Sequence, residues 1–101
     1  MIIQVTKHAE ERGKSRLGLS KRAVLRQAQL AYERGYPHSH TKGNLRKWID
    51  KEATKLNCYA SDYVVYNSGL FIFRNVDDAK ILITVLNIPS NLTRNLKSYI
   101  K

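Results

Sequence analysis

The spacing of apolar residues changes near position 57, and this change limits the folds that are open to the chain. Before it, apolar residues recur every three or four positions, which is typical of amphipathic helices. After it, they form short runs rich in β-branched and aromatic residues, which is typical of strands. The pattern predicts an α+β protein, a single domain over residues 1–101, with helices on a mostly antiparallel sheet.

The first third of the chain predicts a strand and two helices. Residues 1–6 are mostly β-branched and indicate an opening strand. A polar helix follows over residues 7–16, with Thr6 as its N-cap and Gly18 at its left-handed end. A second helix runs from the N-cap Ser20 to a stop at Gly35, with small residues spaced for close helix packing.

A loop over residues 36–40 and a third helix over residues 41–56 complete the helical part. Pro37 favours the loop because proline disfavours helix at the preceding residue. The third helix has the clearest apolar face of the chain, formed by Leu45, Trp48, Ile49, Ala53 and Leu56.

The second half predicts an antiparallel meander of three strands over residues 62–66, 70–74 and 81–86. The last of these is apolar throughout, so we expect it at the centre of the sheet, buried on both sides. Pro89 ends it, and the tail over residues 90–101 has the spacing of a short helix.

The alternation of side chains along strands assigns residues of the meander to faces of the sheet. Five of them are expected in the core, on two shared faces: Phe71 with Phe73, and Ile81, Ile83 and Val85 together. Tyr63 and Tyr66 fall on opposite faces, so we expect one of them to be exposed or to lie at an interface.

Positive charge is concentrated in the first half. The chain carries a formal charge of +10, and residues 1–55 hold 13 of the 18 basic side chains but 5 of the 8 acidic ones. Such a balance favours a polyanionic partner, and nucleic acid is the most common one. The apolar content of 43% argues against a wholly disordered basic chain.

Several classes of protein do not fit the sequence. Its apolar runs are too short to cross a bilayer and its first residues lack the pattern of a signal peptide, so we expect no membrane partner and a cytoplasmic location. The single Cys58 excludes an internal disulfide, and no Cys/His cluster has zinc spacing. We therefore expect no metal and no cofactor.

His8, Arg12 and Arg16 recur every four residues on the first predicted helix, so they share one face. A run of cations and an imidazole on one face favours an anion opposite it. The same pattern also fits a solvated helix whose charges pair with Glu10 and Glu11.

This region resembles a known family. The segment Thr6-Lys7-His8-Ala9, followed by Arg12, Arg16 and Gly18, resembles the T-x-H-A-x-x-R-x-x-x-R opening of small bacterial and phage proteins related to the RelE/ParE toxin superfamily. The order of a strand, helices and a meander ending in a run like Ile83-Thr84-Val85-Leu86 is also similar. The third helix and the tail after Pro89 depart from that pattern.

The resemblance implies a cytosolic toxin that binds RNA and cleaves messenger RNA without metal. In such cleavage a base deprotonates a 2′-hydroxyl, cations stabilise the charged phosphorane, and an acid protonates the leaving oxygen. By the motif, His8, Arg12 and Arg16 are the candidate catalytic residues. The resemblance also implies an acidic antitoxin as protein partner.

Further residues are candidates for binding nucleic acid. His40 and Lys42 lie where the third predicted helix begins, and helix N-termini favour anions. Tyrosine in a strand can stack on a base, and basic side chains contact phosphates. The nucleic-acid-binding set is His40, Lys42, Arg46, Lys47, Lys51, Tyr66 and Arg74. For the basic residues of the helix, a solvated amphipathic surface is the alternative interpretation.

Two other functions fit the same charge. The chain could be a non-enzymatic phage anti-defence inhibitor that binds a host nuclease or nucleic-acid complex, or an accessory protein that binds duplex DNA. Alanine at His8 separates the first of these from a toxin, because it removes cleavage but leaves protein inhibition intact.

Overall fold

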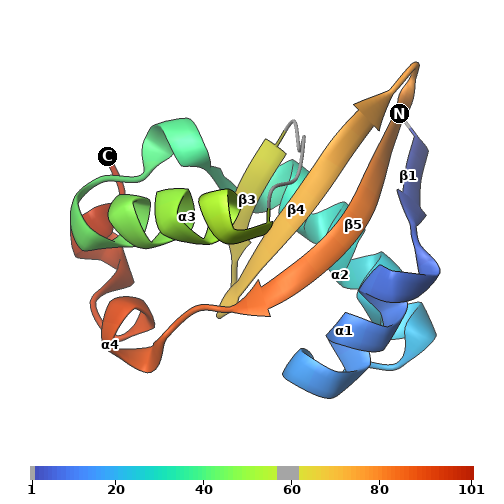
Figure 1. Ribbon diagram of the computed structural model, residues 1–101, viewed down its shortest axis with the longest axis horizontal. Coiled ribbons are helices and arrows are strands. Elements are labelled where there is room, and N and C mark those ends of the chain that lie inside the picture. Colours follow the sequence, from blue (N-terminus) through green and yellow to red (C-terminus); the bar gives the residue numbers. More distant parts are fainter. Residues whose placement is uncertain (1, 57–61) are drawn as a thin grey trace.

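The computed structural model describes residues 2–56 and 62–101 and shows a five-stranded mixed sheet with helices on both faces (Figure 1). The expected α+β class is therefore confirmed. Cys58 and the side chain of Leu56 lie outside the described part of the chain.

The sheet has the strand order β1-β5-β4-β3-β2. Its outer strand β1 runs parallel to β5, and all other neighbours are antiparallel. The strands are β1 (Ile2–Val5), β2 (Tyr36–Pro37), β3 (Asp62–Tyr66), β4 (Gly69–Val76) and β5 (Ala79–Asn87).

Helices α1 (Lys7–Leu17) and α2 (Lys21–Arg34) cover one face of the sheet, and both begin at the N-caps expected from the sequence. The Thr6 hydroxyl accepts a hydrogen bond from the Ala9 amide at 3.0 Å, and the Ser20 hydroxyl accepts one from the Ala23 amide at 3.2 Å. Gly18 has a φ of +67° and ends α1 in the left-handed conformation.

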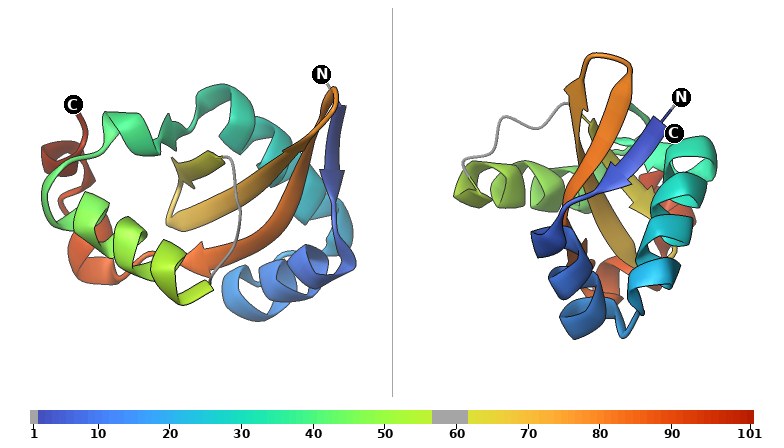
Figure 2. Two further views of the ribbon diagram at one scale, coloured as in Figure 1. Left: turned by 45° about the horizontal axis from the view of Figure 1, so that its top comes forward. Right: turned by 90° about the vertical axis from the view of Figure 1, so that its right-hand side faces the viewer.

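Helix α3 (Gly43–Leu56) covers the other face, together with the C-terminal segment (Figure 2). That segment contains one α-helical turn, α4 (Ser90–Thr93), and the 3-10 helix η2 (Leu96–Tyr99). A further 3-10 helix, η1 (His38–His40), precedes α3.

The two faces carry separate hydrophobic cores, since β-strand side chains alternate between them. The core beneath α1 and α2 contains Ala9, Val24, Ala28, Ala31, Val64, Phe71, Phe73, Leu82 and Val85. The core beneath α3 contains Leu45, Ile49, Val65, Leu70, Ile72, Ile88 and Leu92. Because both faces are covered, the sheet is buried on both sides over most of β4.

Two expected segments differ from the structure around α3. Residues 36–40 are not a loop, because Tyr36 pairs with Val65 as an edge strand and η1 follows. The third helix starts at Gly43 rather than at Thr41, which instead forms an isolated bridge with Ile100. The tail is not one helix either, because α4 ends at Thr93, η2 follows, and Ile100 is extended where it pairs with Thr41.

The meander differs from expectation in its centre and its faces. The middle strand is β4, whose residues 69–73 are all buried, while β5 lies beside it. Between Ile72 and Phe73 the pairing moves from Thr84 to Leu82, so Ile83 has no partner in the ladder. This bulge separates Ile83 from Val85, which pack in different cores.

The tyrosines of β3 also correct an expectation. Tyr63 and Tyr66 do point to opposite faces, but neither is exposed. Tyr66 packs against the core of α1 and α2, and Tyr63 packs against the core of α3. An exposed ring was wrongly expected, because helices cover both faces of the sheet and not one.

Candidate nucleic-acid interface

Positive charge lies on the helices and the tail rather than on the sheet. Residues 62–87, which contain β3, β4 and β5, hold two basic and three acidic side chains, whereas the rest of the chain holds 16 basic and 5 acidic ones. The helical layers therefore surround a sheet of slightly negative charge. A polyanion is attracted to the helices from outside.

On α1, the expected stripe begins with two exposed residues in contact. The Nε–H of Arg12 donates to Nε2 of His8 at 3.4 Å. Nε2 of His8 is the acceptor in this contact. Ala9 and Gly13 form the buried side of the helix, so the pair faces solvent.

Arg16 completes the stripe but has a structural contact. Its Nη1 donates to the carbonyl oxygen of Val85 on β5 at 2.9 Å. The parallel pairing of β1 with β5 reaches only to Leu82, so this carbonyl lies beyond the end of β1. Arg16 thus helps to hold α1 along the part of β5 that β1 leaves uncovered.

Some of the residues before α3 make structural contacts, and others are exposed. Nε2 of His38 lies 2.7 Å from Oδ1 of Asp50, which ties η1 to α3. Thr41 is buried and donates its hydroxyl hydrogen to the His38 carbonyl at 2.7 Å. The side chains of His40 and Lys42 remain exposed.

The backbone joins this corner to the C-terminus. The Lys42 amide donates to the Tyr99 carbonyl at 2.7 Å, and the Lys101 amide donates to the His40 carbonyl at 2.8 Å. The sequence gives no signal for this pairing between distant segments. It adds Lys101 to the expected binding residues at this corner.

The remaining expected residues lie on several elements. Lys47 and Lys51 are exposed on α3, Arg46 is half-buried there, and Arg74 is exposed on β4. Tyr66 is on the opposite face of the sheet, edge-on to Phe71 with ring centroids 6.3 Å apart. The structure therefore does not bring Tyr66 together with the basic residues of α3.

The C-terminal half of β5 separates two basic surfaces. In Figures 1 and 2 it runs between α1 on one side and α3 on the other. The exposed pair of His8 and Arg12 belongs to the first surface, and Lys47 and Lys51 belong to the second.

Lys80 on β5 is not part of either surface. Its Nζ lies 2.8 Å from Oδ2 of Asp62 and 5.3 Å from the ring centroid of Tyr32. The hydrogen bond to the Asp62 carboxylate raises the pKa of Lys80 above its usual range, against the opposing effect of burial. This ion pair links β3 to β5 across β4.

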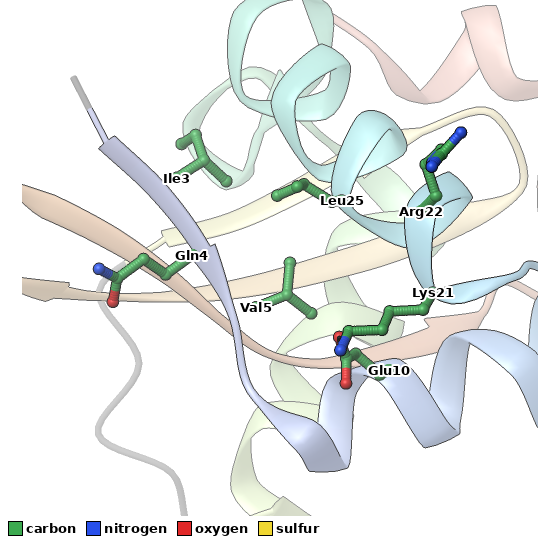
Figure 3. Close-up of a pocket in the computed structure, with 7 residues that line it drawn as sticks. All are labelled: Ile3, Gln4, Val5, Glu10, Lys21, Arg22 and Leu25. Carbon is green, nitrogen blue, oxygen red and sulfur yellow. Dashed lines mark ion pairs between the residues drawn. The ribbon is translucent and has the colours of Figure 1, made fainter.

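A groove of about 770 Å³ lies between β1 and α2, away from the expected site residues (Figure 3). Ile3, Val5 and Leu25 form its apolar part, and an ion pair of Lys21 with Glu10 at 3.8 Å lies on its rim. None of the candidate catalytic or binding residues lines it.

The described residues offer neither a cluster of metal ligands nor a membrane-spanning helix. Within residues 2–56 and 62–101 no three His, Cys, Asp or Glu side chains gather as metal ligands. In the same part of the chain, no helix has both the length and the apolar character needed to span a bilayer.

Sequence reasoning missed Tyr36. Among the described aromatic residues, Tyr36 is the one that is largely exposed, with 43% of its surface accessible. A tyrosine followed by proline is held in extended backbone, which was the available signal for an edge strand.

Comparison with known proteins gives no relative: no family model, no curated protein and no solved structure matches the chain.

Proposed function

We propose that this protein binds single-stranded RNA through basic surfaces on α1 and α3. The observation that carries the proposal is the charge distribution, because 16 of the 18 basic side chains lie outside residues 62–87. RNA has the phosphate density to match such a surface. The cytosol is where it would meet this target.

The order of elements supports a toxin of RelE-like architecture. β1 is followed by two helices on one face, and the strands β3, β4 and β5 follow one another in antiparallel pairs. This is the order that the resemblance of the Thr6 to Gly18 segment implies. α3 and the C-terminal segment are additions to it.

The contact between His8 and Arg12 favours RNA cleavage as a second function. A phosphate that binds the Arg12 guanidinium removes it from Nε2 of His8, which then has a free lone pair. Nε2 takes the proton of a 2′-hydroxyl, and the resulting oxyanion attacks the adjacent phosphorus. The bond to the 5′-oxygen breaks, and this oxygen takes a proton from water, leaving a 2′,3′-cyclic phosphate and a 5′-hydroxyl.

Fluorescence anisotropy with a labelled 12-nucleotide oligouridylate tests binding. We expect the affinity to fall steeply with salt, and we expect a Lys47→Ser/Lys51→Ser variant to lower the salt slope by about 1.4, because each phosphate contact on a single strand contributes about 0.7. Wild-type protein that does not bind the oligonucleotide in low salt contradicts the proposal.

Inducible expression in bacteria tests cleavage, with growth and total RNA followed together. We expect wild type to arrest growth and cut messenger RNA, and His8→Ala/Arg12→Ala to do neither. Lys14→Ala is the matched control, since Lys14 is an exposed cation on the same helix beside Glu10 and Glu11. Cleavage in EDTA with cyclic-phosphate ends supports the mechanism, whereas intact RNA with normal growth refutes cleavage.

The same experiments separate the other two functions. An anti-defence inhibitor is harmless on expression and keeps its protein partner when His8 is alanine. A DNA-binding accessory protein prefers duplex DNA to the oligouridylate and cuts neither strand.

A further inference from the structure

We propose that a groove between Tyr36 and the C-terminal segment binds an unpaired nucleotide of single-stranded RNA. The groove has a volume of about 700 Å³ and lies between Tyr36 on β2 and residues 93–98. The inference rests on the proposed RNA binding, and it assigns this groove as the place where the base of one nucleotide binds.

The charged side chains that line the groove, Arg94 and Lys97, are both basic. Two segments meet at this end of the molecule, residues 36–49 and residues 90–101, joined by hydrogen bonds of the Lys42 and Lys101 amides. Together they contain no Asp or Glu, and their six basic residues are Lys42, Arg46, Lys47, Arg94, Lys97 and Lys101. Asp50, the next residue after the first segment, lies 2.7 Å from Nε2 of His38.

The cations of the groove are available to a ligand. Arg94 and Lys97 line it, both side chains are exposed, and neither belongs to an ion pair among the described residues. The turn that presents them is fixed from within, because the Ser98 hydroxyl donates to the Asn95 carbonyl at 2.6 Å.

Tyr36 supplies the aromatic surface that base stacking needs. Its ring lines the groove and 43% of its surface is accessible, although it belongs to a strand. The backbone of Tyr36 is held by its pairing with Val65, which fixes the position from which the ring projects. An exposed aromatic ring beside a basic track is the arrangement that binds single strands without reading sequence.

This groove is distant from the stripe on α1. Figure 1 shows the C-terminal segment beside α3 at one end of the molecule and α1 at the other. Helix α3, which carries the exposed Lys47 and Lys51, extends from the C-terminal segment toward the middle of the molecule (Figure 1).

Substitution of Tyr36 tests the stacking. In anisotropy with a labelled oligouridylate, we expect Tyr36→Leu to weaken binding by about 5- to 150-fold, the loss typical of one stacked base. Tyr36→Phe keeps the ring and should bind like wild type. Equal binding by Tyr36→Leu and wild type overturns the inference while leaving RNA binding by the other surfaces intact.

The salt dependence separates stacking from charge. We expect Arg94→Ser/Lys97→Ser to lower the slope of log K against log salt by about 1.4, and Tyr36→Leu to leave the slope unchanged. Arg26→Ser, which removes an exposed cation of α2, is the matched control and should also leave it unchanged. A slope that responds equally to Arg26 and to the groove cations overturns the inference.

Photocrosslinking with 4-thiouridine locates the base directly. We expect the crosslinked peptides to contain Tyr36 or residues 93–98. Crosslinks confined to α1 overturn the groove as a nucleotide site but support RNA binding, whereas no binding by wild type overturns both. Stronger binding to an acidic protein surface than to RNA also overturns the inference.

Discussion

Replacing Gly13 with alanine tests how closely α1 and α2 pack. Gly13 is buried in α1, and a Cβ built on it would lie 2.4 Å from Cγ2 of Val24 on α2. Helix propensity alone predicts that alanine stabilises the protein by about 1 kcal/mol. Overpacking of a tight core costs about 1–3 kcal/mol, so we expect a net loss of roughly 0–2 kcal/mol.

The double variant decides between these effects. Val24→Ala alone removes two buried methyl groups and should cost about 1–3 kcal/mol. In Gly13→Ala/Val24→Ala the new Cβ occupies the vacated space, so the two changes should be favourably coupled by about 1–3 kcal/mol.

Urea unfolding followed by circular dichroism at 222 nm measures all four proteins of this cycle. If Gly13→Ala is stabilising by itself and the coupling energy is below about 0.5 kcal/mol, these results refute the close packing of Gly13 against Val24. An unchanged slope of free energy against urea checks that the variants unfold in the same manner.

Three other substitutions test contacts within the fold. Arg16→Met removes the hydrogen bond to the Val85 carbonyl and should cost about 1.5–3 kcal/mol in the same urea assay. Because the pKa of Lys80 is raised, its ion pair should stabilise the protein below pH 10.5, and this contribution should be lost as the pH rises through the folded-state pKa. In a plot of unfolding free energy against pH, Asp62→Asn should reduce the fall in stability above pH 10.5. In Gly35→Ala the new Cβ would lie 2.3 Å from a valine methyl of β3, so thermal melting should show a loss of about 1–3 kcal/mol.

The local features of the fold could be predicted because they depend on neighbouring residues. Thr6, Ser20 and Gly18 end or start helices through contacts within four positions, and the structure has them where expected. Gly35 does stop α2, but its backbone is extended, with a φ of −73°. Glycine is required at position 35 because Val64 on β3 leaves no space for a Cβ, and not because of its backbone conformation.

The features that were missed depend on distant residues. Tyr36 is in a strand because it pairs with Val65, and Ile100 is extended where it pairs with Thr41. Likewise, the bulge at Ile83 comes from its pairing with β4, and no pattern within β5 alone indicates it.

The candidate site was predicted in part. The spacing of His8 and Arg12 correctly placed them on one face of α1, and the structure adds that they are in contact and exposed there. It could not show that Arg16 has an acceptor on β5, or that Tyr66 lies across the sheet from α3. Those relations follow from how the layers pack, which a single helix or strand does not encode.

The parallel pairing of β1 with β5 has a consequence for synthesis of the protein. Thr6 contacts Ile83, 77 residues later, so at roughly 5–20 residues per second the first strand waits about 4–15 s for its partner. Ile2–Val5 is apolar and carries no charge, and such a segment readily pairs with other chains. A ribosome that stalls before β5 therefore holds a nascent chain whose opening strand is exposed, and it completes the sheet only when translation resumes.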